Sequence, residues 1–440
     1  MTSIASVADH LRALLSEVAD EAARASGCVQ RLRAFSGATL VQTLVLGWLA
    51  KPQASLHELT QMAAVRGVTV SPQALHQRFD ARLAATLRQV LEAMLERAVT
   101  TDPAAVPLFE RFSGIYIQDG TTLSLPPELA QMWPGCGGRP GQGTAALKLQ
   151  VAFDLLGGAL SGPVLQAGRA QDRTSPLRTA PLPANSLRLH DTGFMVLDDL
   201  RTYADASVWT LCRLPVNITL AVGDGPRVSQ GEVLLKRTET ALDLDVHLGA
   251  AQPVPARLLA VRVPTQVAQQ RRRTLRRQAK KQGQQVSRAR LALADWTVLV
   301  TTAPRALLSL EEGVILARIR WQIELVFKLW KRDGQIDEWR SRHPWRILCE
   351  VYAKLIGMVL QHWFLVLGCW QTVARSLVKA AQTVRLHALA LASALDRRAD
   401  LRAALATLVR CLGIGCRMNT RRQQPNAFQL LLNPAWEPLT

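Results

Sequence analysis

Residues 114–123 read GIYIQDGTTL and decide the fold of this chain. Apolar residues flank Asp119 in an alternating pattern, which is typical of a β-strand. The stretches 147–156 and 159–168 follow as a hairpin around a Gly-Gly turn. Two more strands are expected at 186–194 and 208–214, with helical segments between them. This order predicts an α/β fold with a mixed five-stranded sheet.

The segment before the sheet has helical patterns. Residues 55–67 form one such pattern, and Ser71 is placed to cap a second helix that continues to Leu83. Two helices joined by a tight turn are typical of a helix-turn-helix, which enters a DNA groove. A corner of a plain helical bundle explains the pattern equally well, and both interpretations stay open here.

The composition favours a polyanionic partner. The chain has 440 residues and a formal net charge of +19, with a sequence pI of about 10.6. Such an excess indicates nucleic acid, although an ordinary basic protein is the alternative. The seven cysteines have irregular spacing without a C-x-x-C pair, which disfavours zinc and suits reduced thiols in a cytoplasmic protein.

Membrane association is not expected. The N-terminal residues lack the apolar core and cleavage site of a signal peptide. The apolar run 355–370 is short for a membrane span and carries Gln361 and His362. A buried helix is the better interpretation of this run.

The stretch 318–331, RIRWQIELVFKLWK, predicts one amphipathic helix. On a helical wheel Arg320, Lys328 and Lys331 lie on the same side as Glu324, opposite an apolar face. Exposed ion pairs between these residues would explain the pattern and contribute little stability. The other interpretation is a carboxylate that works on a ligand bound by the cations.

Two strand aspartates favour the second interpretation. Asp119 lies within an apolar strand, where an unpaired carboxylate is costly, and Asp191 ends another strand. If these residues and Glu324 converge, a cation must join them, and hard oxygen ligands suit Mg²⁺. Two such ions can clamp the attacking and leaving oxygens of a phosphodiester displacement. Asp198 is interpreted as a helix cap and Asp172 as a supporting residue at most.

The ordered motifs resemble those of bacterial insertion-sequence transposases of the DDE type, in insertion-sequence family four. Its signature is Tyr-x2-Arg-x3-Glu-x6-Lys, which Arg320, Glu324 and Lys331 match in spacing. The motifs IYIQDGTTLSLP around Asp119 and LHDTGF around Asp191 are similar to the two aspartate motifs of this family. The signature tyrosine position holds Ala317, which is a departure from the pattern.

The resemblance implies a ribonuclease H-like core with a β-rich insertion, flanked by helical domains. The expected segments are a helical DNA-binding domain at 1–105, the first part of the core at 106–214, the insertion with a basic loop at 215–302, the second part of the core at 303–345, and a helical domain at 346–440 that serves dimerisation.

The resemblance also implies the roles of single residues. Asp119, Asp191 and Glu324 would be catalytic and would hold two Mg²⁺ ions, for which Mn²⁺ substitutes. Other residues would contact DNA: Arg320, Trp321, Lys328 and Lys331 around the signature, Trp296 in the insertion, and Arg271, Arg272, Arg273, Arg276, Arg277, Lys280 and Lys281 in the basic loop. Core packing is the alternative for both tryptophans, and a solvated charge run is the alternative for the loop.

The expected function is DNA transposition by a cytoplasmic, nucleoid-associated bacterial enzyme. It would bind terminal inverted repeats as a homodimer, cleave the ends and join the 3′-OH groups to target DNA, without a small-molecule cofactor or a membrane. Two alternatives stay open: an inactive copy that acts as a DNA-binding repressor, in keeping with Ala317, and a metal-dependent nuclease that never joins strands.

Overall fold

The computed structural model describes residues 2–31, 34–137, 143–419 and 427–432. The chain forms two compact units. The first unit comprises 1–104, 120–171 and 322–419, and the second comprises 105–119, 172–321 and 420–440. Residues 420–426 and 433–440 of the predicted C-terminal domain lie outside the described residues. Strand β1 (Ile115–Leu125) has residues in both units, and the predicted domain bounds stay a prediction.

The sheet of the second unit begins with three parallel strands. The first half of β1 pairs with β4 (Leu187–His190), and β4 pairs with β5 (Trp209–Arg213). The four residues of β4 are all buried, as expected for the middle of a covered sheet. Helix α7 (Leu197–Asp205) connects β4 to β5 and contacts β5 through its apolar side. These three strands position the two predicted aspartates.

The insertion continues this sheet and does not form a separate one. Strand β10 (Trp296–Thr301) pairs antiparallel with β5, and the order continues as β9, β8, β6 and β7. The bounds of these strands are β6 (Thr219–Val222), β7 (Val228–Ser229), β8 (Ala241–Leu248) and β9 (Val254–Arg262). The mixed α/β class is therefore confirmed, and the strands of the β-rich insertion extend the sheet beyond the five core strands. Strand β5 offers a second edge, which β10 occupies.

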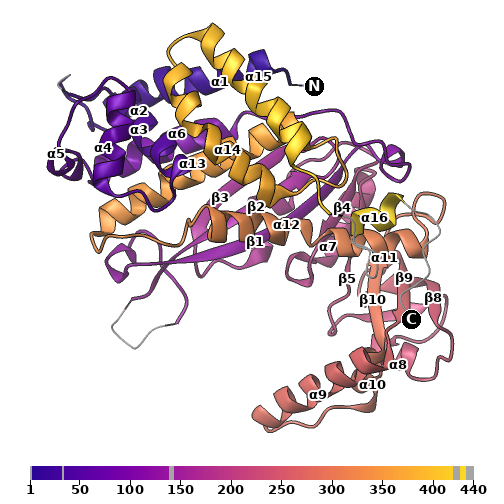
Figure 1. Cartoon of the computed structure of the whole chain (residues 1–440). Coiled ribbons are helices and arrows are strands. Elements are labelled where there is room, and N and C mark those ends of the chain that lie inside the picture. The colour runs from indigo at the N-terminus through magenta and orange to yellow at the C-terminus, as the bar shows by residue number, and fades with distance from the viewer. Residues whose placement is uncertain (1, 32–33, 138–142, 420–426, 433–440) are drawn as a thin grey trace. The chain divides into compact units, whose positions relative to one another are not determined.

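The insertion also contains helices where a basic loop was expected. Helix α9 spans Thr265–Lys281 and is followed by α10 (Arg288–Ala292), while α8 (Gln230–Leu235) lies between β7 and β8. Residues 265–281 contain neither glycine nor proline and are rich in Arg, Gln, Lys and Ala, which are strong helix formers. Figure 1 shows α8, α9 and α10 near the ends of β9 and β10.

In the first unit, the second half of β1 neighbours the hairpin of β2 (Ala145–Asp154) and β3 (Leu160–Ala167). The Gly-Gly turn of this hairpin lies where the sequence placed it. Gly158 has a φ of +79° and lies against Trp370, so that a Cβ on this residue would come within 3.0 Å of the indole. Only glycine satisfies both conditions at low cost.

Helices from both ends of the sequence pack together in the first unit (Figure 1). The N-terminal helices are α1 (Ile4–Ala13), α2 (Ala19–Ala25), α3 (Gly37–Ala50), α4 (Leu56–Val65), α5 (Pro72–His76) and α6 (Ala81–Leu95). The C-terminal helices are α13 (Pro344–Cys369), α14 (Leu377–Ala394) and α15 (Arg398–Gly415). Buried Arg66 on the N-terminal side donates to Gln42 and to the Ala392 carbonyl, which joins α3 to α14.

Helix α13 is the core of this helical body. It contacts α3, α6 and α15, and it is long and apolar enough to cross a membrane by length and composition. However, 89% of its most apolar window is buried inside the protein, as in the core helix of a globular domain. The interpretation of residues 355–370 as a buried helix is confirmed.

The predicted helix-turn-helix is present only in part. Ser71 caps α5 as expected, since its Oγ accepts from the Ala74 amide at 3.1 Å. However, α5 ends at His76, and Asp80 caps the separate helix α6. The second helix of the motif is thus a five-residue turn, shorter than the predicted helix to Leu83.

The signature segment is also divided. Helix α11 (Leu310–Ile319) ends just before Arg320, α12 (Gln322–Lys328) carries Glu324, and a π-helical turn (Leu329–Asp333) carries Lys331. The predicted apolar face is buried, with Ile319, Val326, Leu329 and Trp330 in the cores of their units. The single predicted helix is therefore three short segments. The last described helix, α16 (Ala427–Leu432), contacts α11.

Candidate active site

Asp119 and Asp191 lie at the same level of two neighbouring strands. The parallel register of β1 and β4 pairs Ile115 with Leu187 and Ile117 with Leu189. Asp119 follows Ile117 by two residues, and Asp191 follows Leu189 by two residues. Neighbouring strands are about 5 Å apart, and side chains at equivalent positions of parallel strands point to the same face. The register therefore directs both carboxylates towards the same end of the two strands, and their joint role in one site stays a prediction.

The backbone around Asp191 turns away directly after the strand. Asp191 caps a short 3₁₀ turn, and its Oδ1 accepts from the Thr192 amide at 2.8 Å. Gly193 lies against a third carboxylate, because a Cβ on it would come within 3.3 Å of Asp172 Oδ2. Asp172 thus lies next to the turn that carries Asp191, and its supporting role stays a prediction.

Arg320 lies beside Asp119. Its Nη1 is 3.5 Å from Asp119 Oδ2, and both side chains are mostly covered, with 18% and 23% of their surface exposed. A guanidinium at this distance offsets the charge of the carboxylate within a partly desolvated region. Sequence reasoning placed Arg320 on the DNA backbone, whereas the structure places it against a predicted metal ligand.

His190 is buried at the end of β4, directly before Asp191. Burial lowers its pKa to about 4, and Arg188 and Arg320 add to this effect, while Asp191 opposes it. Its Nδ1 lies 3.2 Å from the carbonyl oxygen of Asp191, which can only accept, so Nδ1 carries the proton. The imidazole is therefore neutral at physiological pH and supports the backbone of Asp191.

Arg188 fixes the strand that carries Asp119. It is buried in β4 and donates to Gln118 Oε1 at 3.2 Å and to the carbonyls of Leu177 and Ala180 at 3.1 and 3.0 Å. Burial lowers the pKa of its guanidinium, and the group also lies 4.8 Å from the centre of the Tyr203 ring. Since Gln118 precedes Asp119, this network restrains the backbone next to the carboxylate.

Glu324 and Lys331 belong to the first unit. Glu324 is partly exposed on α12, and Lys331 Nζ donates to the Thr122 carbonyl of β1 at 3.1 Å. The amide of Gly334 donates to the Leu329 carbonyl at 2.9 Å, which closes the π-helical turn around Lys331. Turns of this kind are frequent at functional sites.

The donor chemistry of the predicted site suits a divalent metal ion. Asp119, Asp191 and Glu324 offer carboxylate oxygens only, and Mg²⁺ prefers such ligands together with water. Within the described ranges, no group of three or more His, Cys, Asp and Glu side chains is arranged to hold a metal ion. The two aspartates belong to one compact unit and Glu324 to the other, and their joint role in metal binding stays a prediction.

The two predicted DNA-binding tryptophans differ sharply in exposure. Trp321 is 45% exposed at the start of the segment that carries Glu324. Trp296 is 3% exposed in the core of the insertion, and the Arg262 guanidinium lies 4.5 Å from the centre of its ring. Core packing, the alternative for both residues, is what the structure shows for Trp296.

Comparisons with known proteins agree with these motifs. The family model described as "Transposase DDE domain" matches residues 110–360, more than half of the chain. The chain belongs to the DDE transposase family. The match includes Asp119, Asp191 and Glu324, together with the signature arginine and lysine. The resemblance found in the sequence is thus confirmed.

Similar proteins are transposases of bacterial insertion sequences. The transposase for insertion sequence element IS231D of Bacillus thuringiensis subsp. finitimus is 27% identical over 79% of this chain and 77% of its own length. The transposase for IS421 of Escherichia coli is 26% identical over 78% of this chain and 89% of its own. The piggyBac transposase, in a synaptic complex with hairpin DNA, aligns with a TM-score of 0.45 at 9% identity over 91% of this chain and 85% of that chain.

Helix α9 of this transposase has an inner and an outer side. On the inner side, Arg271 donates to the Trp296 carbonyl at 2.8 Å, and Arg272 forms an ion pair with Asp295. The outer side exposes five cations: Arg273, Arg276, Arg277, Lys280 and Lys281. A cavity of about 470 Å³ is lined by Arg276, Lys280 and the turn at 283–286. The predicted DNA-binding residues of this segment therefore fall into two groups, of which only the outer one is fully available to phosphates.

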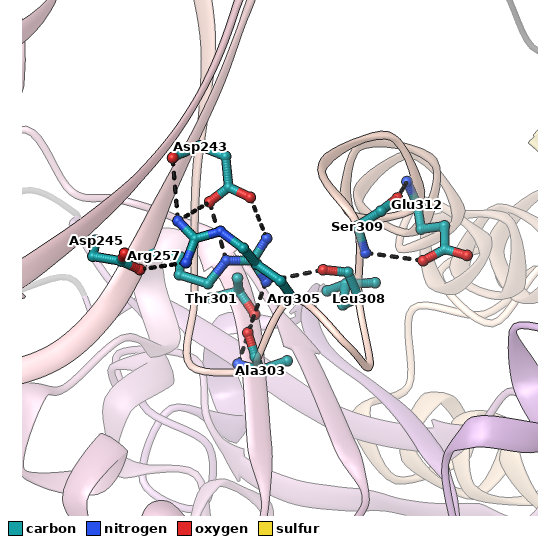
Figure 2. A network of polar contacts seen from close by, with 9 residues as sticks. All are labelled: Asp243, Asp245, Arg257, Thr301, Ala303, Arg305, Leu308, Ser309 and Glu312. Atoms are coloured by element: carbon teal, nitrogen blue, oxygen red, sulfur yellow. Dashed lines mark hydrogen bonds and ion pairs between the residues drawn. The ribbon is translucent and has the colours of Figure 1, made fainter.

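A buried arginine holds the loop that leads to the signature segment (Figure 2). Arg257 on β9 donates through Nη1 to the carbonyls of Ala303 and Leu308, both at 2.9 Å. Its Nε bonds Asp243 on β8 at 3.0 Å, and Arg305 in the loop pairs with Asp243 and with exposed Asp245. These contacts fasten the start of α11 to two strands of the insertion.

Sequence reasoning missed Arg188, His190 and Arg257. Each lies inside an apolar stretch that becomes a strand, for instance LRLH at 187–190. A charged or polar residue in such a strand must find partners when it is buried, so its position alone is a signal of a polar network. The partners could not be predicted, because Gln118, Leu177 and Ala303 are distant in sequence.

Proposed function

We propose that this transposase binds the terminal inverted repeats of an insertion sequence, cleaves the DNA at both ends and joins the 3′-OH groups to target DNA. The observation that carries the proposal is the register of β1 and β4, which places Asp119 and Asp191 level on neighbouring parallel strands. Two adjacent carboxylates repel each other unless a cation joins them. A divalent ion therefore explains why both occur there.

Asp119, Asp191 and Glu324 would hold two Mg²⁺ ions, with Mn²⁺ as a substitute. When bound, such ions lower the pKa of water and stabilise charge on phosphate oxygens. Arg320 balances the charge near Asp119 and would offer its guanidinium to a substrate phosphate. Neutral His190 holds the Asp191 carbonyl through Nδ1–H and so keeps this end of β4 in place.

DNA would be bound by cations along the exposed surfaces of both units. Lys328 is exposed on α12, and Lys331 follows in the π-helical turn. The outer cations of α9 would track a phosphate backbone, and exposed Trp321 would stack on a base near the cleaved end. The enzyme would act in the bacterial cytoplasm as a nucleoid-associated homodimer on double-stranded DNA.

One observation favours a second function. Ala317 lies near the end of α11, where the signature has tyrosine. Loss of a DNA-contacting side chain fits a copy that binds its ends but no longer cleaves them, and so represses transposition. The three predicted metal ligands are all present in the sequence, which supports catalysis over this alternative.

The test incubates the protein with end DNA that carries the inverted repeats flanking its reading frame, with Mg²⁺ or Mn²⁺ and target plasmid. Joined products support the proposed transposase, whereas nicks without joining indicate a nuclease. A band shift without cleavage indicates a repressor. If Asp119→Ala, Asp191→Ala and Glu324→Ala each retained full cleavage, the proposed site would be wrong.

A further inference from the structure

A buried ion pair in α13 lies directly against the end of the signature segment. Lys354 is 2% exposed and Glu350 is 4% exposed, and Lys354 Nζ lies 2.7 Å from Glu350 Oε1. The same ammonium donates to the carbonyls of Gln335 and Glu338, both at 2.8 Å. All three N–H groups of Lys354 thus have an acceptor, and two of these acceptors are backbone groups of the turn 334–338.

This turn follows the π-helical segment of Lys331 without an intervening residue. Gln335 has a φ of +48°, a left-handed conformation that costs a residue with a side chain about 1 kcal/mol or more. Gly334 is pressed against α13, since a Cβ there would come within 2.4 Å of Met358 Sδ. Such a turn persists only when its surroundings hold it, and here Lys354 and Met358, one helical turn apart, do so.

A buried ion pair contributes little net stability to the turn that it holds. Moving two charges out of water costs several kcal/mol, and apolar residues of similar volume often stabilise a protein as well or better. The ion pair adds directional contacts. Because the Lys354 ammonium donates to three acceptors at once, the Gln335 and Glu338 carbonyls must lie in one arrangement around it. Burial lowers the pKa of Lys354 and raises that of Glu350, while each partner opposes this shift in the other.

We propose that Lys354 is a positioning residue of the transposase, which fixes the turn 334–338 and through it the placement of Lys331. The π-helical turn of Lys331 continues into this turn without a break, so a shift at Gln335 displaces the Lys331 side chain. Lys331 Nζ also donates to the Thr122 carbonyl of β1 at 3.1 Å, a second contact that depends on where the π-helical turn lies. The inference rests on the proposed cleavage of end DNA.

The decisive variant replaces the pair by apolar residues, Glu350→Leu with Lys354→Met. Its midpoint of urea unfolding should stay near or modestly below that of the wild type, because no charge is left unpaired but the Gln335 and Glu338 carbonyls lose their donor. Binding of end DNA in band shifts should change less than about twofold, since the exposed cations are unchanged. Single-turnover cleavage of bound DNA should fall on the order of tenfold to a hundredfold, as expected for displaced catalytic groups.

A double-mutant cycle with Lys331→Ala separates positioning from a general defect. If Lys354 acts through Lys331, the apolar pair should slow the Lys331→Ala enzyme far less than it slows the wild type. Arg398→Gln is the matched control, because it removes an exposed ion pair with Asp9 in the same unit and should cleave at the wild-type rate.

A stable apolar-pair variant that cleaves at the wild-type rate would overturn the inference, as would effects that simply multiply in the cycle. If this variant does not fold, the double variant Glu350→Gln with Lys354→Gln keeps a neutral hydrogen-bonding pair. Its single-turnover cleavage rate and its double-mutant cycle with Lys331→Ala then test the inference in the same way. Wild-type protein that fails to cleave counts against the proposed function itself. If the wild type cleaves end DNA and the variants cleave it equally fast, only the role of Lys354 is wrong.

Discussion

The two compact units hold their proposed site residues by different physical means. In the second unit, Asp119 and Asp191 are placed by the hydrogen-bond register of parallel strands, and buried Arg188 and His190 of β4 contact the neighbouring residues. In the first unit, Glu324 and Lys331 lie on a short helix and a π-helical turn. That segment is held from outside by one buried ammonium on α13.

The difference concerns how far the site residues of each unit can move. A strand in the middle of a sheet cannot shift by one residue without turning its whole side-chain set to the other face. A short helix followed by a strained turn has no such ladder, so its placement depends on a few directional contacts. We therefore expect the aspartates to tolerate changes around them better than Glu324 and Lys331 do. Substitutions can test this difference between the two units. They can also test the difference between buried cations, such as Arg257, and exposed ones.

The largest effect is expected from the carboxylates themselves. Asp119→Asn, Asp191→Asn and Glu324→Gln should each lower the cleavage rate on the order of a thousandfold or more, because ligands of the divalent ions provide several kcal/mol of transition-state stabilisation. Band-shift affinity for end DNA should persist. Asp198→Asn, which removes an exposed carboxylate on α7, serves as the control and should cleave normally. Equal losses in all four variants would point to misfolding and not to metal binding.

The next effect concerns the loop in Figure 2. Arg257→Gln should lower the free energy of unfolding by about 3–5 kcal/mol, because it leaves the Asp243 carboxylate and two carbonyls without a buried cation. Arg305→Gln removes a half-exposed partner of the same carboxylate and should cost less than about 1 kcal/mol. Urea unfolding of both variants measures the difference. If both variants lost a similar free energy of unfolding, the burial of Arg257 would not be the cause of its contribution.

Acid should weaken the first unit through His362. Burial lowers its pKa to about 4 from the ordinary 6.5, although its bond to the Gly158 carbonyl at 2.8 Å opposes the shift. The unfolded chain binds the proton first, so stability is complete above about pH 6.5 and is lost as the pH falls towards 4. Between pH 7 and pH 5 the wild type should lose about 2 kcal/mol more than His362→Gln in urea unfolding. Parallel losses in both proteins would contradict the assigned shift.

The smallest effect is expected on the outer side of α9. Arg276→Gln with Arg277→Gln should reduce the salt dependence of end-DNA binding by about 0.9 in log–log slope for each phosphate that the variant no longer neutralises. Arg272→Gln on the inner side should lower stability because it removes the ion pair with Asp295, and it should change the slope less. Binding measured across a range of salt concentrations compares the two. An unchanged slope in the outer variant would remove α9 from the DNA-binding surface.

The sequence by itself determined the five core strands, the buried character of α13 and the family of the chain. Alternating apolar residues specify strands locally, and the spacing of Asp119, Asp191, Arg320, Glu324 and Lys331 is a property of the sequence alone. These features depend on near neighbours along the chain, which any single sequence displays.

Only the tertiary structure decided which residues meet. The level placement of Asp119 and Asp191 depends on the pairing of β1 with β4, and the contact of Arg320 with Asp119 depends on the break between α11 and α12. The burial of Trp296 and the bonds of Lys354 to the turn 334–338 likewise follow from packing. Such contacts join residues far apart in sequence, and their geometry is selected by the free energy of the whole core and not by local propensity.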